Sequence, residues 1–303
     1  MTEKKLSFAI FGSKSGAAKS NRISELIEKL RSKNATIYVE KYFLNAIASS
    51  IDREAKRDIC AFEMIDFSVD FIISLGGDGT FLRAVGRTGS LQVPIIGVNM
   101  GRLGFLANIP QEELNLTIDN IYANEFSVEE RAVIKLECPD REIIINPFAL
   151  NDIAILKRDM AAMISIRMAI NGEFLTAYLA DGLVISTPTG STAYSLSIGG
   201  PIMVPQTSTL SITPVAPHSL NIRPIVISDE AEITLEVESR SHNFLVAIDG
   251  RSVKMKEGTT LTIRKAPYKV KILKPKNNTF FRTLREKLMW GADTRKLGGK
   301  LSK

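Results

Sequence analysis

A glycine-rich segment with one acidic residue has the clearest chemical content in this sequence. Gly76–Thr80 reads GGDGT and follows directly on the apolar run Phe71–Leu75. Three glycines let a ligand approach the backbone, and free N–H groups in such a loop favour an anion such as phosphate. A carboxylate beside phosphate is unfavourable without a task, so we expect Asp78 either to accept a proton from an attacking hydroxyl or to hold Mg²⁺. A glycine-rich turn with a surface aspartate is the alternative.

A second segment is dense in small hydroxylated side chains. Thr187–Ser197 carries these together with Tyr194, and it runs into Ile198–Pro201. Its hydroxyls and amides could bind ribose or phosphate, and Tyr194 could stack on a base. An ordinary Ser/Thr/Gly loop is the alternative interpretation.

Two acidic positions accompany these segments. Asn151-Asp152 interrupts the apolar run Ala149–Leu156, and Asp181-Gly182 precedes the hydroxyl-rich segment. Adjacent polar residues are costly in a buried strand unless a ligand's hydroxyls or a neighbouring strand satisfy them. Either pair alone is as consistent with a turn as with a site.

The elements around Gly76–Thr80 alternate between strands and helices. Apolar residues at helical spacing occupy Ile23–Leu30. Four short apolar runs predict strands: Leu6–Phe11, Thr36–Val39, Phe71–Leu75 and Pro94–Val98. This alternation predicts a parallel sheet covered by helices, and such sheets bind ligands at the carboxyl ends of their strands. We therefore expect an α/β domain over residues 1–108.

Strand patterns dominate after a helix that we expect near Glu112–Ala123. Asn171-Gly172 predicts a tight hairpin. The predicted strands are Arg141–Asn146, Ala149–Leu156, Ile164–Ile170, Glu173–Ala180, Gly182–Ser186, Ala231–Glu238, Thr259–Arg264 and Tyr268–Leu273. Residues 109–277 should thus form a β-rich, sandwich-like domain. An apolar helix in 278–303 should return to the first domain.

Composition narrows the class of protein. The 303 residues are 45% hydrophobic and 24% charged, as in ordinary globular chains, and no apolar run is long enough to cross a bilayer. Most of the net charge of +6 lies in the basic stretch Arg282–Lys303, so we expect a solvated tail rather than a nucleic-acid surface. We expect a cytoplasmic protein that binds neither nucleic acid nor membrane.

Several enzyme signatures are absent or incomplete. Gly12–Ser20 nearly spells a phosphate-binding P-loop, but two alanines separate Gly16 from Lys19. No GxGxxG dinucleotide fingerprint is present, which argues against a dehydrogenase. The two histidines, His218 and His242, lie in no nucleophile-elbow or zinc-ligand pattern.

Taken together, these segments resemble the NAD kinases. The resemblance rests on Gly76–Thr80, Asn99–Leu106, Asn151-Asp152 and Asp181–Pro201, which occur in the family's order and spacing, and it continues to Lys287–Gly291. The GGDGT segment alone is weak, because lipid kinases and phosphofructokinase relatives share it. The hydroxyl-rich segment and the combination are specific.

The resemblance implies the NAD kinase/diacylglycerol kinase-like fold, with the active site between the two domains. It implies transfer of a phosphoryl group from ATP to the 2′-hydroxyl of the adenosine ribose of NAD, with Asp78 as general base. A divalent metal ion, Mg²⁺, would arrive with ATP rather than in a protein site, and the protein would be a homodimer or homotetramer. The implied NAD- or ATP-binding residues are Gly76, Gly77, Asp78, Gly79, Thr80, Arg83, Asn151, Asp152, Asp181, Thr192, Ala193, Tyr194, Ser195, Leu196, Ser197 and Ala216.

Two positions depart from the family pattern. Many members carry arginine where this chain has Leu179, and a glutamine or similar polar residue is common where Arg251 stands. The alternatives are a lipid kinase of the diacylglycerol or sphingosine type and a dinucleotide sensor without catalysis. The first would lack the Thr187–Pro201 segment, and the second would gain little from Asp78.

Overall fold

Two units of similar size make up the chain. The computed structural model describes residues 5–14, 21–101, 104–139, 146–159, 162–275 and 279–291. The first unit combines Met1–Glu129 with Lys271–Lys303, and the second is Glu130–Val270. The first unit extends past the expected boundary at residue 108, because the helix Leu114–Tyr122 packs into its core.

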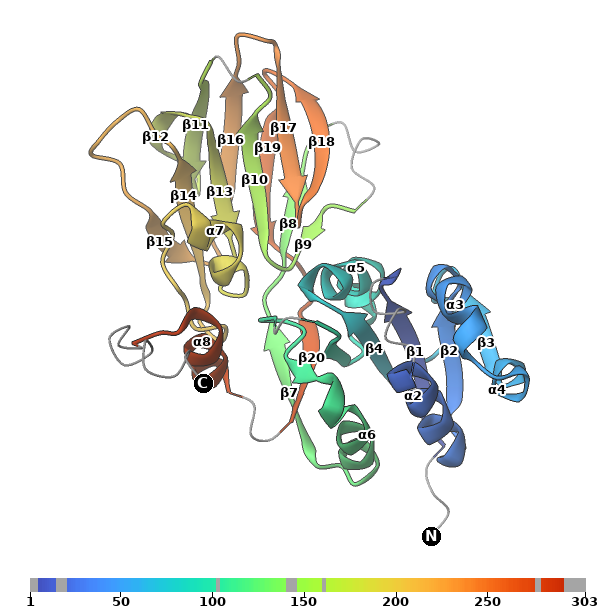
Figure 1. Cartoon of the computed structure of the whole chain (residues 1–303). Coiled ribbons are helices and arrows are strands. Elements are labelled where there is room, and N and C mark those ends of the chain that lie inside the picture. The colour runs from blue at the N-terminus through green and yellow to red at the C-terminus, as the bar shows by residue number, and fades with distance from the viewer. Residues whose placement is uncertain are drawn as a thin grey trace, which may run out of the picture. The chain divides into compact units, whose positions relative to one another are not determined.

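A largely parallel sheet forms the centre of the first unit (Figure 1). The described strands follow the order β3-β2-β1-β4-β5-β20-β7, and β6 pairs with β5. Their bounds are β1 Ser7–Gly12, β2 Thr36–Glu40, β3 Ile59–Phe62, β4 Phe71–Gly76, β5 Ile95–Asn99, β6 Ile109–Pro110, β7 Phe126–Arg131 and β20 Val270–Pro275. The predicted α/β class is confirmed, and β1 with β4 marks the point where the strand order reverses.

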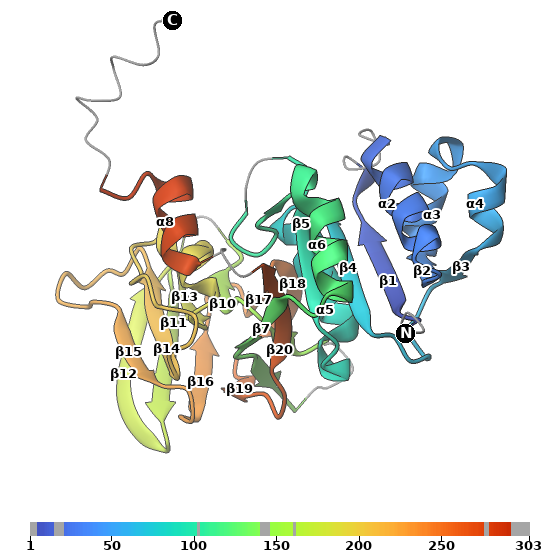
Figure 2. The ribbon, with the colours of Figure 1, turned by 90° about the horizontal axis from the view of Figure 1, so that it is seen from below.

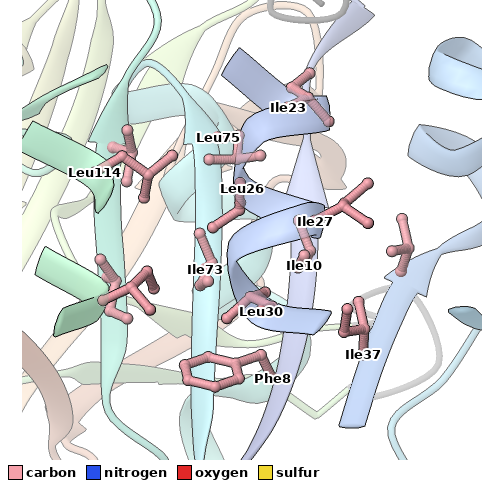
Figure 3. Packing of buried hydrophobic residues seen from close by; sticks show 14 of the residues in the cluster. Phe8, Ile10, Ile23, Leu26, Ile27, Leu30, Ile37, Ile73, Leu75 and Leu114 are labelled. Carbon is pink, nitrogen blue, oxygen red and sulfur yellow. The ribbon is translucent and has the colours of Figure 1, made fainter. Parts of the chain in front are cut away.

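Helices cover both faces of this sheet because alternate strand residues are apolar on both sides. One face carries α2 (Asn21–Ser32), α3 (Lys41–Ile47), α4 (Arg53–Arg57) and α6 (Leu114–Tyr122). Figure 2 shows α2 and α6 side by side along it. In Figure 3, side chains of α2 such as Leu26 are directed at Ile73 and Leu75 of β4. The opposite face carries α5 (Asp78–Thr88), whose Phe81 fills the space left by Gly97 of β5.

Among its described residues, the first unit also contains 3-10 turns at Ala48–Ser50, Gly89–Leu91 and Gln111–Glu113. The last helix, α8, runs from Phe280 to Leu288, and Thr279 caps it by accepting the N–H of Arg282.

Two antiparallel sheets form the second unit. One has the order β15-β14-β13-β10-β17-β18 and the other β12-β11-β16-β19-β8-β9. The bounds are β8 Ile134–Glu137, β9 Phe148–Ala149, β10 Asp152–Lys157, β11 Ile164–Ile170, β12 Glu173–Ala180, β13 Gly182–Ser186, β14 Thr209–Val215, β15 Ile225–Ser228, β16 Ile233–Glu238, β17 Asn243–Ile248, β18 Arg251–Lys256 and β19 Thr260–Lys265. Apolar residues of both sheets share one core, so the expected β-sandwich is confirmed.

The outer face of the first of these sheets is different in character. Ala154, Val184 and Ala247 form a small apolar cluster on it, together with Ile198. Because side chains alternate along strands, Asp152, Ser186 and Asp249 belong to the same face. The segment with η5 (Gly190–Thr192) and α7 (Tyr194–Ser197) packs against this face.

Local chain geometry agrees with the turn signals. Asn171 and Gly172 have φ of 51° and 82° and join β11 to β12, which confirms the predicted hairpin. The predicted strand Ala149–Leu156 is wrong at Leu150-Asn151, where the chain leaves β9 in one sheet and enters β10 in the other. The predicted strand Arg141–Asn146 falls mostly outside the described residues, as do positions 15–20 of the P-loop-like segment Gly12–Ser20.

Candidate functional site

Gly76–Thr80 lies at the carboxyl end of β4 and begins α5. Gly77 is the N-cap residue, with extended φ and ψ of −103° and −170°, and Asp78 is the first helical residue. The N–H groups of Thr80 and Phe81 both donate to Gly77 O. Because β1 and β4 border the reversal of strand order, this helix start lies where open parallel sheets bind ligands.

The Asp78 carboxylate binds a later loop of the same unit. Oδ1 accepts the N–H groups of Leu106 and Ala107 at 3.0 and 2.9 Å, and Oδ2 accepts that of Phe105 at 3.0 Å. A Cβ on Gly104 would lie 2.0 Å from Oδ1, so glycine is required there by the carboxylate itself. Oδ2 accepts one N–H group, whereas Oδ1 accepts two, and the Asp78 side chain is 31% exposed. Oδ2 can therefore accept a hydrogen bond from one more donor.

Glycine is present in this segment for two different structural reasons. A Cβ on Gly76 would meet the Thr80 hydroxyl at 2.4 Å, so that glycine belongs to internal packing. A Cβ added to Gly77 or Gly79 would have no atom within 4 Å, and neither glycine has a positive φ. Neither crowding nor backbone conformation within the unit explains them, whereas close approach of a ligand does.

Arg83, expected near phosphate, pairs with a buried carboxylate. Its Nη1 lies 3.0 and 2.9 Å from the two oxygens of Glu40, and its Nη2 donates to Gly12 O at 2.6 Å. Glu40 is 2% exposed and also binds Arg87. A phosphate contact by Arg83 would compete with this arrangement, which ties α5 to the ends of β1 and β2.

In the second unit, an aspartate holds the chain at the break between β9 and β10. Asp249 accepts the N–H groups of Leu150, Asn151 and Asp152 at 2.8, 2.8 and 3.2 Å. These donors turn to the carboxylate instead of a sheet partner, which explains why the strand is interrupted. The sequence analysis did not predict a role for Asp249. The available signal was the dipeptide Asp249-Gly250, which is typical of a turn, and both residues have positive φ in the structure.

The polar pair Asn151-Asp152 is buried and incompletely satisfied. Asn151 is 8% exposed, and its Oδ1 has no hydrogen-bond partner among the described residues. Burial, and to a lesser extent the neighbouring Asp249 carboxylate, raise the pKa of Asp152 to about 7. An unsatisfied amide oxygen next to an uncompensated carboxyl is costly without a partner, so the pair is suited to a ligand's hydroxyl or amino group.

Most hydroxyls of Thr187–Pro201 serve the fold of the segment. Ser191 Oγ donates to Pro188 O and accepts Met203 N, and Ser195 Oγ lies 3.4 Å from Thr213 Oγ1. Glycines allow this packing, since a Cβ on Gly190 would lie 2.1 Å from Asn151 O. Thr192 and Ser197 likewise bind backbone carbonyls within the segment.

Tyr194 is the aromatic side chain of this segment and stays 37% exposed. Burial raises the pKa of its hydroxyl, and the charges of Asp152 and Asp181 add to the effect. The structure thus brings Tyr194 near both acidic positions. The remaining predicted residues of the segment, Ala193 and Leu196, lie in the same turns beside it, half-buried.

The other two predicted positions, Asp181 and Ala216, lie directly before β13 and directly after β14. Asp181 forms a 2.6 Å ion pair with Lys157 and donates its N–H to Val215 O. Ala216 follows directly with a positive φ of 43°. Leu179, the departure from arginine, is 46% exposed.

The other departure, Arg251, serves the local fold. Its guanidinium donates to two backbone carbonyls, Phe148 O at 3.1 Å and Ile248 O at 3.2 Å.

The described residues offer neither a protein metal site nor a membrane-spanning helix. They contain no group of three or more His, Cys, Asp or Glu side chains placed to hold a metal ion. No helix among them is long and apolar enough to cross a membrane.

Comparisons of the sequence with protein-family models and with known proteins agree with one another. The family model of the ATP-NAD kinase N-terminal domain matches residues 9–126, and that of the ATP-NAD kinase C-terminal domain matches residues 150–275. A protein named NAD kinase from Bacteroides fragilis is 56% identical over 290 residues, which cover 96% of this chain and 100% of the relative. Another, from Porphyromonas gingivalis, is 41% identical and covers 95% of this chain and 99% of its own.

Solved structures agree in fold. The yeast NADH kinase complexed with NADH has a TM-score of 0.86 at 23% identity, covering 97% of this chain and 90% of its own. An NAD kinase from Archaeoglobus fulgidus in complex with ATP has a TM-score of 0.70 at 27% identity, covering 94% and 99%. With both family models matched over most of the chain and relatives above 40% identity along it, this protein belongs to the NAD kinase family.

Proposed function

We propose that this protein is an NAD kinase that transfers the terminal phosphoryl group of ATP to the 2′-hydroxyl of the adenosine ribose of NAD, which gives NADP. Family membership supports the activity. The observation that carries the site is the start of α5, where Asp78 keeps an acceptor position beside two glycines that face open space. Lipid-kinase activity has no support among the relatives named above.

Asp78 is the proposed proton acceptor. Its carboxylate is fixed in one orientation by three backbone N–H groups, so little reorganisation accompanies the reaction. Oδ2 then accepts the proton of the ribose hydroxyl as the hydroxyl attacks phosphorus. Positioned carboxylates of this kind typically contribute about 10²- to 10⁴-fold to a rate.

The residues around Asp78 provide the phosphate-binding surface. Gly77 and Gly79 let phosphate oxygens reach the first N–H groups of α5, where the helix dipole favours negative charge. Mg²⁺, bound by the phosphates of ATP rather than by a cluster of acids, would neutralise charge on the transferred group.

The second unit supplies the proposed recognition of NAD. Asn151 Oδ1 and the Asp152 carboxyl accept hydroxyl or amino groups of the dinucleotide, which removes the cost of leaving them buried without partners. Tyr194 stacks on a base, and Asp181 binds a hydroxyl beside it.

We also propose, from the family resemblance, a homodimer or homotetramer in the cytoplasm that binds neither nucleic acid nor membrane. Size-exclusion chromatography with light scattering tests the assembly. A stable, fully active monomer would contradict it.

The activity is tested with purified protein, ATP, Mg²⁺ and NAD, with NADP measured by an NADP-specific dehydrogenase. Asp78→Ala should lower kcat by at least 100-fold while NAD still binds, as measured by calorimetry. Asp119→Ala is a control, because that aspartate of the same unit pairs with Lys29. NAD binding without turnover in the wild type would indicate a sensor, and full activity in Asp78→Ala would remove the proposed base.

A further inference from the structure

The last helix brings a lysine to the carboxylate of Asp78. In α8, Thr283 and Leu284 are buried and Lys287 lies in the last turn. Its Nζ is 3.8 Å from Asp78 Oδ2 and 4.7 Å from the ring centroid of Phe105, above the aromatic face. Lys287 therefore contacts both the first residue of α5 and the loop that Asp78 binds, about two hundred residues earlier in the chain.

This lysine does not complete the hydrogen bonding of Asp78. A separation of 3.8 Å is too long for an N–H···O bond, and three backbone N–H groups already bind the carboxylate. Within the described part of the chain, Nζ has no acceptor at hydrogen-bonding distance. The side chain is 30% exposed, so its three donors remain available to a ligand.

A cation at the start of α5 would offset the negative charges of Asp78 and of a bound phosphate. Asp78 places a negative charge where the phosphates of a substrate must approach. The two arginines of α5, Arg83 and Arg87, are paired with the buried Glu40. Lys287 is the cation that the structure places at Oδ2 itself.

The distances suit a contact with the transferred group. A hydroxyl accepted by Oδ2 lies about 3 Å from that oxygen, and phosphorus in a productive complex lies about 3–3.5 Å beyond the hydroxyl. Nζ approaches the same oxygen at 3.8 Å, so a phosphate oxygen at this position is within reach of the lysine by rotation of its side chain.

We propose that Lys287 is a further catalytic residue, whose ammonium binds the phosphate chain of ATP; this rests on the NAD kinase function proposed above. In the reaction, a bond forms between the ribose 2′-oxygen and the terminal phosphorus of ATP. The bond from that phosphorus to the bridging oxygen breaks, and ADP leaves with its electron pair. The hydroxyl proton passes to Asp78 and then to solvent, while Lys287 keeps its protons and stabilises the phosphate charge.

The test compares Lys287→Met with Arg285→Met, which removes the same charge from an exposed position two residues away on α8. Calorimetry measures the binding of MgATP, of inorganic tripolyphosphate with Mg²⁺, and of NAD. For Lys287→Met, both phosphate ligands should bind about 10- to 100-fold more weakly, as expected for loss of a charged hydrogen bond, and NAD should bind as before. Lys287→Arg should recover most of the affinity.

Unchanged binding of both phosphate ligands by Lys287→Met would overturn the proposal, as would an equal loss in Arg285→Met. If only MgATP binding weakened, the lysine would act on the nucleoside, which also overturns it. Lys287→Gln replaces the methionine variant if thermal melting shows that the latter is unfolded. NADP formation by the wild type is measured in parallel, so failure of the NAD kinase function is seen separately from failure of the lysine contact.

Discussion

Replacing Gly79 with alanine should separate the needs of the fold from those of the ligand. Gly79 is the second residue of α5, and an added Cβ would have no atom within 4 Å. Its φ is not positive, so alanine fits the backbone. The methyl group would instead occupy the space in which we expect a phosphate oxygen to approach.

The two expected effects have opposite directions. Glycine in a helix is about 0.5–1 kcal/mol less favourable than alanine, so Gly79→Ala should stabilise the first unit by up to that amount. A methyl carbon where a phosphate oxygen must reach the backbone N–H displaces the oxygen by about 1 Å, and misplacement of this size can cost on the order of 100-fold in rate. The variant should therefore be at least as stable as the wild type and nearly inactive.

Two measurements check this pair of effects. Denaturant unfolding gives the free energy of unfolding, and the NADP assay gives kcat and the KM for ATP. Gly101→Ala is the matched control, because its Cβ also meets no atom within 4 Å but it lies outside the start of α5. Full activity of Gly79→Ala would refute the approach of a ligand at this glycine. A lower free energy of unfolding would show that the added methyl group clashes with the protein itself, which would refute the structural premise.

Three further predictions follow from contacts in the structure. Gly104→Ala should lower stability by about 1–3 kcal/mol and abolish NADP formation, since its Cβ would lie 2.0 Å from Asp78 Oδ1; unchanged melting and activity would contradict this. Asp152 has a folded pKa of about 7, so the folded protein binds more protons than the unfolded chain from about pH 4 to pH 7, and stability falls as pH rises through that window. Asp152→Asn should remove this loss, up to about 4 kcal/mol at pH 8 in denaturant unfolding, and parallel pH profiles of the two proteins would contradict it. Glu40→Ala should cost about 1–3 kcal/mol in thermal or denaturant unfolding, less than a fully buried pair, because its two arginine partners are 35% and 40% exposed and can be hydrated; an unchanged free energy of unfolding would contradict it.

The parts of the fold that local patterns determine were predicted well. Apolar runs gave β1, β2, β4 and β5, and residues at helical spacing gave α2. Several strands were missed. β3 (Ile59–Phe62) is four residues long, has two exposed residues and lies at the edge of its sheet, whereas β14 (Thr209–Val215) is seven residues long, largely buried and lies between β13 and β15. Each forms by pairing with strands that are distant in the sequence or flanked by loops, which a local pattern does not contain.

The break between β9 and β10 shows a second limit. Apolar residues continue through Leu150, so the run Ala149–Leu156 has the pattern of one strand. Asp249, about a hundred residues away, takes three N–H groups and directs the chain from one sheet into the other. Long-range capture of backbone donors by a carboxylate overrides the local pattern, and only the paired positive-φ turn at Asp249-Gly250 hints at it.

For the same reason, the sequence alone explains only some of the glycines near Asp78. Gly76 packs against Thr80, four residues later, so its cause lies within the motif. Gly104 is required by Asp78, and that link spans 26 positions and needs the fold to be visible. A Cβ on Gly77 or Gly79 would meet no atom within 4 Å, so packing does not explain them, and the proposed approach of phosphate to the start of α5 accounts for both. Gly101 is equally open, so an open glycine alone does not identify a ligand site; Gly77 and Gly79 are singled out because they flank the proposed base.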